Sequence, residues 1–237
     1  MARIVVCVIH YSSHNSSHNT KLYIMKKLLI IIIFAFLCPQ LAHAHQPRIV
    51  TGLDATVVQS PEDSQAFYGT LDGTPHTFTI NSPSTFDLYV GLLTPVAPGA
   101  ADNISATITD TAGKSVAELD GTNVVWTKFY EPFAGDDYKQ GPEFEKQVEA
   151  GAYSIQIHNT NNSGKYVVAI GKIESFPLSE ILHTIKVLPT LKADFFGKSV
   201  FSAYFNYTGL FMLGTIIVIV GILFIGIWIV KKIRHKI

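Results

Sequence analysis

Residues 86–92 read FDLYVGL, and every second side chain of this stretch is apolar. Phe86, Leu88, Val90 and Leu92 therefore share one face of an extended chain, and the residues between them share the other. Because successive side chains of a β-strand point to opposite faces of a sheet, this alternation predicts a strand with one buried face.

The same alternation recurs along the middle of the chain. It is present in HTFTI at 76–80, ISATIT at 104–109, YSIQIH at 153–158 and YVVAI at 166–170. Gly, Pro, Asn and Asp residues that favour turns separate these stretches. Roughly nine short strands with polar outer faces predict an all-β domain, built as an antiparallel β-sandwich or jelly roll.

A resemblance to a known module type agrees with this prediction. Residues 148–155 read VEAGAYSI and residues 164–168 read GKYVV. Together they resemble the closing hairpin of bacterial pre-peptidase C-terminal domains, which are exported jelly-roll modules. Phe78 and the stretch 87–90 also fall where such a module would place strands. The resemblance implies a binding or solubility module, but a fold does not by itself identify a ligand.

The formal net charge of zero conceals an uneven distribution of charged residues. All 18 Asp and Glu residues lie between Asp54 and Asp194, whereas only 10 of the 18 Lys and Arg residues lie between Arg48 and Lys198. The middle of the chain is therefore acidic, and the remaining basic residues lie near its ends. An acidic domain repels phosphate, which argues against nucleic acid as a partner.

Residues 25–44 have the order of a signal peptide. The basic start Met25-Lys26-Lys27 is followed by ten apolar residues at 28–37, and the sequence Ala-His-Ala then ends at Ala44. A basic region, a short apolar region and an A-x-A site are typical of secretory signals. Cleavage after Ala44 would leave His45 at the mature N-terminus.

The first 24 residues contain two Ser-Ser-His-Asn repeats. We expect residues 1–24 to be a non-native or disordered extension that precedes the true start. The two cysteines of the sequence, Cys7 and Cys38, then both fall in the removed part. The mature domain is expected to have neither a disulfide nor a thiol nucleophile.

A membrane-spanning helix is predicted at the C-terminus. Residues 209–230 form a run of 22 residues without a charged side chain. At about 1.5 Å per residue this run is about 33 Å long, enough to cross a hydrocarbon core. Four basic residues lie in the tail 231–237, and aromatic residues gather at the start of the run: Tyr204, Phe205, Tyr207 and Phe211. We expect a single-pass cell-membrane protein of type I topology, with the acidic domain outside and the tail in the cytoplasm.

The sandwich is expected to extend over residues 45–173, and a helical juxtamembrane linker, 174–208, joins it to the apolar helix. After Pro177, apolar residues recur at helical spacing, and Pro189 is expected to end that helix. A second short helical segment is expected around 191–197. The apolar stripe suits packing on the sandwich, and it suits equally the lipid interface, where Lys192 and Lys198 would reach head groups.

Segment 126–145 is rich in aromatic and acidic residues, and we expect it to be a long loop on the β-scaffold. Such a loop could recognise a glycan or a peptide by ring stacking and by hydrogen bonds to carboxylates. The alternative is that its rings cap the open end of the sandwich. The candidate ligand-binding residues are Trp126, Tyr130, Glu131, Asp136, Asp137 and Tyr138.

Two metals are considered as cofactors. Asp136 and Asp137, with Glu131 or other nearby carboxylates, could bind calcium, which prefers six to eight oxygen ligands. A mature N-terminal His45 could offer its amine and imidazole to copper, with His76 or His158 as a second ligand. By alternation His76 is in phase with Phe78 and is expected to be buried.

No motif of a hydrolase or metalloprotease is present, such as G-x-S-x-G or H-E-x-x-H, so an enzyme is not predicted. Our leading interpretation is a membrane-anchored extracytoplasmic binding or accessory module. It would recognise a glycan, a peptide or a membrane-protein partner through residues 126–145. Two alternatives remain, a copper-binding exported protein that uses His45 and a subunit of a membrane complex that acts through the linker and the apolar helix.

Overall fold

The computed structural model describes residues 27, 45–52, 54–101 and 103–234. The predicted extension and, apart from Lys27, the predicted signal peptide lie outside the described residues. Contacts divide the chain into two compact units. One unit is His43–Phe211, and the other contains the part of the last helix from Met212 onward. The sandwich and the linker both belong to the first unit.

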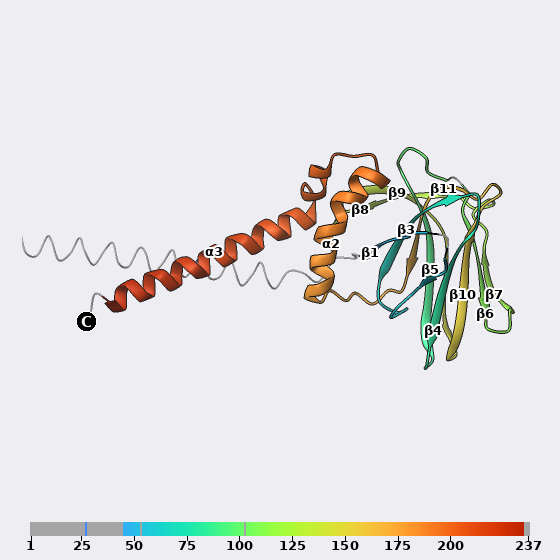
Figure 1. The fold of residues 1–237 in the computed structure, drawn as a ribbon, viewed down its shortest axis with the longest axis horizontal. Helices are drawn as coiled ribbons and strands as arrows, with labels where there is room; N and C mark the ends of the chain where they lie inside the picture. Colours follow the sequence, from blue (N-terminus) through green and yellow to red (C-terminus); the bar gives the residue numbers. More distant parts are fainter. Residues whose placement is uncertain (1–26, 28–44, 53, 102, 235–237) are drawn as a thin grey trace, which may run out of the picture. The chain divides into compact units, whose positions relative to one another are not determined.

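Within the described residues, eleven strands form two sheets (Figure 1). The six-stranded sheet has the order β1 (Gln46–Ile49), β3 (Gln65–Asp72), β11 (Ser163–Ile170), β5 (Phe86–Pro95), β9 (Asp136–Val148) and β8 (Thr127–Glu131). The five-stranded sheet has the order β2 (Thr56–Val57), β4 (His76–Ser82), β10 (Gly151–His158), β6 (Ser105–Asp110) and β7 (Ser115–Leu119). The predicted β-sandwich is confirmed.

The core between the two sheets is made by the apolar faces that the alternation predicted. Phe78, Leu88, Val90, Ile108 and Ile155 are completely buried. Side chains from both sheets join one apolar cluster, so burial of these faces is what holds the sheets together. The polar residues between them point away from the core, as expected for strands with one solvated face.

The first two strands depart from the predicted antiparallel pattern. β1 pairs with β3 in parallel, and β2 pairs with β4 in parallel. The chain alternates between the sheets here, so each parallel pair is separated by one strand of the opposite sheet. That intervening strand provides the return that a parallel pair requires.

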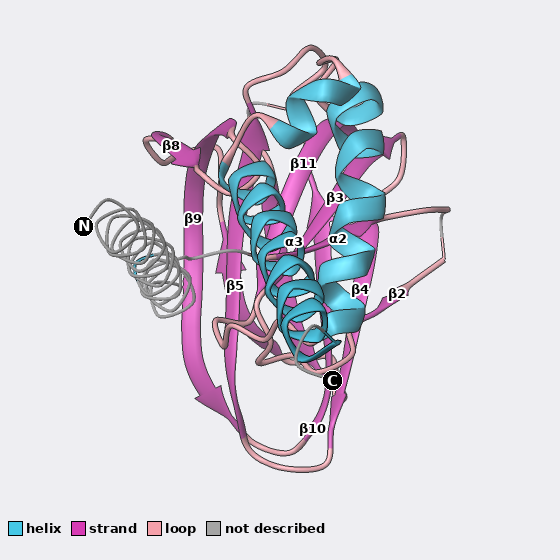
Figure 2. Ribbon diagram, turned by 90° about the vertical axis from the view of Figure 1, so that its left-hand side faces the viewer, coloured by secondary structure: helices cyan, strands magenta, loops and turns pink. Residues whose placement is uncertain are grey.

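The linker packs on the outer face of the six-stranded sheet (Figure 2). It consists of α2 (Leu178–Thr190), a π-helical turn η1 (Leu191–Phe195) and a 3₁₀-helix η2 (Val200–Tyr204). Leu191, Phe195 and Phe196 form an apolar cluster with residues of β3, β9 and β11. The linker therefore packs on the sandwich, and Lys192, which is 1 % exposed, does not reach outward as a lipid contact would require.

The prediction that Pro189 ends the helix is wrong, because this residue lies inside α2. Proline lacks the N–H that an α-helix needs at that position. The chain continues as a π-helical turn, in which the Phe196 N–H donates to the carbonyl oxygen of Leu191 at 3.0 Å. Gly197, with a φ of 65°, then ends the helical stretch.

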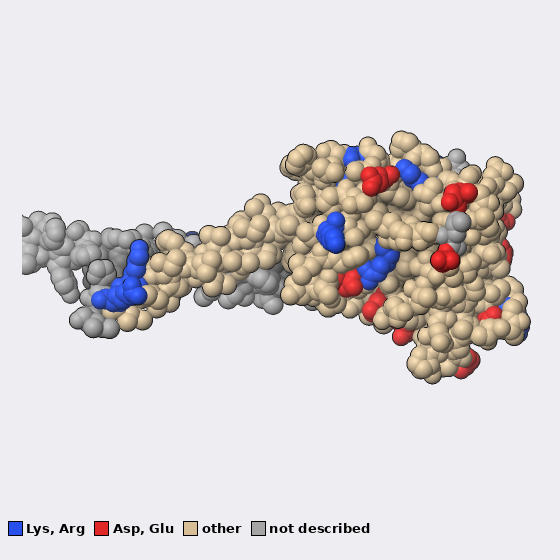
Figure 3. Space-filling model, viewed as in Figure 1, with Lys and Arg blue, Asp and Glu red and all other residues tan. Residues whose placement is uncertain are grey.

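The last helix, α3 (Tyr207–Arg234), is long and apolar enough to cross a membrane. Its stretch Tyr207–Lys231 has 25 residues and a mean hydropathy of 2.9. Basic side chains gather at its C-terminal end, whereas acidic side chains are spread over the sandwich (Figure 3). This helix matches the predicted span 209–230.

Candidate functional site

The segment 126–145, which we expected to be a loop, is a β-hairpin. Strands β8 and β9 pair antiparallel from Thr127 opposite Gln140 to Glu131 opposite Asp136. The turn between them is residues 132–135, and the Gly135 N–H closes it by donating to the Glu131 carbonyl oxygen at 2.9 Å. Gly135 has a φ of 72°, which few other residues tolerate. Because the two strands are paired in a sheet, every second side chain of this segment points towards the interior of the protein.

The predicted ligand-binding residues are split by this alternation. Tyr138 is buried, and its hydroxyl oxygen lies 3.1 Å from that of Tyr68. Trp126 packs against the main core, and its indole N–H donates to the Gly121 carbonyl oxygen at 2.9 Å. Glu131 and Asp136 are buried as well. Only Tyr130 and Asp137 of the six candidates are exposed, so the six do not form one ligand surface.

The buried carboxylate of Asp136 binds two lysines of the linker. Its Oδ2 lies 2.6 Å from the Nζ of Lys192, and its Oδ1 lies 2.8 Å from the Nζ of Lys198. Asp136 is 0 % exposed, and Lys192 also donates to the Ala134 carbonyl oxygen. Burial lowers the pKa of Lys192. Both carboxylate oxygens are thus occupied by protein donors, so Asp136 is a poor candidate for the predicted calcium site.

Glu131 holds the hairpin turn from inside. Its Oε1 accepts the backbone N–H of Phe133 at 2.7 Å, and its Oε2 accepts that of Ala134 at 2.6 Å. Burial raises the pKa of Glu131 to about 7, although these two N–H groups act in the opposite direction. The turn is therefore fastened by a carboxyl group that titrates near neutral pH.

The same turn caps the start of α3. The Tyr207 N–H donates to the Pro132 carbonyl oxygen at 3.3 Å, and the Thr208 N–H donates to that of Phe133 at 3.2 Å. The next amide, of Gly209, donates to the side-chain Oδ1 of Asn206 at 3.0 Å. The first N–H groups of a helix have no partner within the helix, and here three of them are satisfied.

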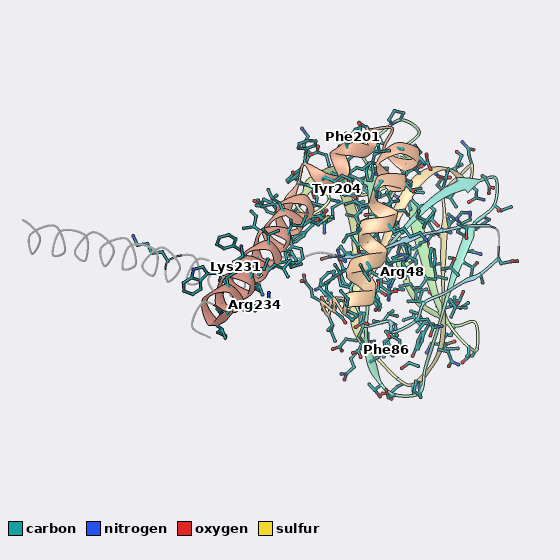
Figure 4. The ribbon with its side chains drawn as sticks, turned by 60° about the vertical axis from the view of Figure 1, so that its left-hand side comes forward. Arg48, Phe86, Phe201, Tyr204, Lys231 and Arg234 are labelled. Carbon is teal, nitrogen blue, oxygen red and sulfur yellow. The ribbon has the colours of Figure 1, made fainter. Side chains whose placement is uncertain are left out.

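We call this cluster the junction: the hairpin turn 132–135 with its flanking residues Glu131 and Asp136, the two lysines Lys192 and Lys198, and residues 206–209. Its parts come from a hairpin, from the linker and from the first turn of α3, and all lie in the unit His43–Phe211. The preceding segment carries exposed Phe201 and Tyr204 (Figure 4). Sequence reasoning missed Lys192, Lys198, Asn206 and Gly209 as a group. The one local signal was Asn206, a residue favoured as N-cap, placed directly before an apolar helix.

A hollow of about 590 Å³ lies between β1, β2 and the first half of α2. Arg48, which is labelled in Figure 4, donates to a carboxylate oxygen of Glu180 at 2.8 Å. His183 lies 3.2 Å from the Pro47 carbonyl oxygen. These contacts fasten α2 to the edge strand β1.

His45 and His76, one of the two histidine pairs considered for copper, lie far apart. His45 contacts the Ser64 hydroxyl at 2.5 Å, just before β3. His76 lies 2.9 Å from the Tyr166 hydroxyl and 3.9 Å from Asp72, the last residue of β3. At about 3.3 Å per residue, the length of β3 separates them by roughly 20 Å or more. One copper ion cannot bind both of these residues, so the prediction that His76 is the second ligand is wrong.

His76 is buried as predicted, and burial lowers its pKa. The described residues contain no group of three His, Cys, Asp or Glu side chains that could hold a metal ion. Calcium binding, and copper binding by His45 with His158 as the second ligand, stay predictions from the sequence.

No protein-family model matches this chain, and no curated protein matches it. Solved structures with a similar fold include the pre-peptidase C-terminal domain of a collagenase from Bacillus anthracis. That comparison has 12% sequence identity and a TM-score of 0.32, and it covers 52% of this chain and 97% of that one. The module type that the closing hairpin resembles is thus among the similar structures.

Two further similar structures are family 35 carbohydrate-binding modules. One, from an environmental isolate, is 16% identical with a TM-score of 0.27, and covers 46% of this chain and 80% of that one. The other, from Cellvibrio japonicus Abf62, is 12% identical with a TM-score of 0.26, and covers 44% of this chain and 69% of that one.

Proposed function

We propose that this chain is a non-enzymatic accessory module, anchored in a membrane by α3, that holds an acidic β-sandwich at the outer surface. The observation that carries the proposal is the junction. Asp136 is buried between Lys192 and Lys198, and three backbone N–H groups of α3 are capped by Asn206 and the hairpin turn. The chain thus fastens its globular part directly to the start of its apolar helix.

The charge distribution supports the proposed topology, with the sandwich outside and the basic tail in the cytoplasm. The run 209–230 has no ionisable side chain, so it suits an anchor better than a transport path. Basic residues that follow such a run stay preferentially in the cytoplasm. The acidic sandwich on the other side of the run would then be exported.

The proposed partner is another membrane protein. Most of the acidic and aromatic residues of the hairpin serve contacts inside the molecule, which makes a glycan or peptide site there less suitable. The linker instead offers exposed apolar side chains on α2, with Leu178 70 % and Leu182 58 % exposed. Apolar side chains at neighbouring positions of one helix are a typical contact for another protein.

Single-cysteine labelling tests anchoring and sidedness. Cys7 and Cys38 are replaced by Ser, and a cysteine is introduced at Asn123 in the sandwich or at Lys236 in the tail. In intact cells, a membrane-impermeant maleimide should label the first variant and should label the second only after lysis. The reverse pattern would contradict the sidedness, and release of the chain by alkaline carbonate would contradict the anchor.

A photoreactive residue at Leu182 tests the partner surface in native membranes. We expect crosslinks to a discrete membrane protein from this position. The matched control is Val125, which is 88 % exposed and lies on the sandwich. Equal crosslinking from both positions, or none from Leu182, would count against the proposed surface.

A further inference from the structure

Several aromatic side chains are exposed just before and within the first turns of α3. Phe201 is 69 % exposed and Phe205 is 87 % exposed, and Tyr204, Tyr207 and Phe211 are exposed as well. In water this exposure is unfavourable, but aromatic rings are enriched where membrane proteins pass the head-group region.

The hairpin turn adds to this aromatic group, although it lies far earlier in the chain. The ring of Phe133 packs edge-on against Tyr207, with 6.1 Å between their centroids. The Phe133 carbonyl oxygen accepts both the N–H and, at 2.9 Å, the hydroxyl of Thr208. Phe133 therefore lies beside the first turn of α3.

The depth of the hairpin turn in a membrane can be derived from the residues of α3 that it contacts. The charge-free run begins at Gly209, and the turn contacts the two residues before it. At about 1.5 Å per residue, these contacts lie within one helical turn of the start of the run. The head-group region on each side of a bilayer is roughly 5–7 Å thick. The hairpin turn thus lies at the level where the helix would pass that region.

The backbone of the turn also suits an environment with little water. The carbonyl oxygens of Pro132, Phe133 and Ala134 accept hydrogen bonds from Tyr207, from Thr208, and from Asn206 and Lys192, respectively. The N–H groups of Phe133 and Ala134 donate to Glu131, and proline has none. In water, the backbone N–H and C=O groups of a β-turn can form hydrogen bonds with the solvent. Near hydrocarbon, each of these groups needs a hydrogen-bond partner in the protein.

We propose that the hairpin turn, residues 132–135, lies in the membrane interface beside the start of α3 and forms a second contact of the sandwich with lipid. The contact is made by the side chains of Pro132 and Phe133, together with the exposed rings of η2. The proposal rests on the proposed membrane anchor. Its ligand is a lipid surface, bound by apolar and aromatic contacts rather than by a head-group pocket.

The test is depth-dependent fluorescence quenching in reconstituted vesicles. The chain carries the two Cys-to-Ser replacements and one new cysteine labelled with the dye NBD. The positions are Phe133, Phe201, Val125 and Leu213, and the vesicles are phosphatidylcholine with a nitroxide high on the acyl chain. Pro132→Cys is a second label in the turn, which keeps the Phe133 ring if F133C fails to fold.

We expect the dye at Phe133, Pro132 and Phe201 to be quenched roughly twofold more than at Val125, as for side chains buried at the interface. Quenching at Leu213 reports insertion of α3 itself. If Leu213 is quenched while both turn positions behave like Val125, the interfacial turn is refuted and the anchor stands. If Leu213 is not quenched, the anchor fails and the interfacial turn fails with it.

Discussion

The side chain of Asn206 binds the backbone of Ala134, 72 residues earlier in the chain. Its Nδ2 donates to the Ala134 carbonyl oxygen at 2.8 Å, while its Oδ1 accepts the N–H of Gly209. One amide group therefore caps α3 and ties that cap to the hairpin of the sandwich. The remaining contacts of the junction reinforce this link, and each can be tested by substitution.

Asn206→Ala removes the hydrogen bonds to Ala134 and Gly209, and also those that Nδ2 donates to the carbonyl oxygens of Ser202 and Ala203. We expect it to lower the free energy of unfolding by about 1–2 kcal/mol, the usual cost of losing an N-cap side chain. Hydrogen exchange should also accelerate at the amides of residues 207–209. Asn206→Asp keeps the acceptor for Gly209 but loses the donor to Ala134. Its free energy of unfolding should therefore lie between those of the wild type and the alanine variant. Pulse proteolysis in urea gives the energies, and an unchanged alanine variant would refute the role of this cap.

Asp136→Asn leaves Lys192 buried without an opposite charge. Removing one partner of a buried ion pair typically costs about 3–5 kcal/mol, and we expect a loss of this size. Lys198→Met should cost less, because the Lys198 side chain is partly exposed and Asp136 keeps its buried partner.

The double variant D136N/K192M removes both buried charges and should recover part of this loss. The control is Lys172→Met, which breaks the exposed pair with Glu145 and should cost about 1 kcal/mol or less. If D136N lowered the free energy of unfolding in urea by as little as K172M, the buried ion pair would not be stabilising the packing of the linker.

Glu131→Gln should change how stability depends on pH. The pKa of Glu131 is raised in the folded state to about 7, from an ordinary value of 4.5. Between these pH values the folded chain binds more protons than the unfolded chain, so the free energy of unfolding falls as pH rises. The stabilising contribution of Glu131 to the free energy of unfolding is fully present below pH 4.5 and is lost as the pH rises through 7.

The size of this effect is on the order of 3 kcal/mol across the window, at about 1.4 kcal/mol per pKa unit. E131Q does not titrate, so its unfolding energy should lack this part of the slope. Urea unfolding of both proteins at several pH values measures it. Parallel pH profiles would show that another group carries the dependence.

Gly209→Ala tests the close contact at the start of α3. A Cβ at this position would lie 1.7 Å from the Tyr204 carbonyl oxygen, so the backbone must move. We expect a loss of about 1–3 kcal/mol, typical of overpacking, and faster proteolysis of the segment 197–206. Gly214→Ala is the matched control in the same helix, because a Cβ there meets no atom within 4 Å. Equal effects of the two substitutions would exclude the contact as the cause.

Much of the fold could be predicted from local periodicity. Alternation in residues 76–80 and 86–92 identified strands whose apolar side chains are buried as expected, and helical spacing after Pro177 identified α2. The hairpin at 126–145 was missed because β9 contains Gly141 and Pro142 and does not alternate cleanly. Gly141 is explained by tertiary structure, since an added Cβ would lie 2.5 Å from the ring of Trp126.

The sequence by itself determined the sandwich, the apolar helix and the separation of acidic from basic residues. These features depend on neighbouring residues, whose spacing sets which face is apolar and which run can span a membrane. Only the tertiary structure decided that Asp136 meets Lys192, 56 residues away, and that Asn206 meets Ala134. Such pairs form when packing of the hairpin against the linker excludes water, and no local spacing encodes that approach.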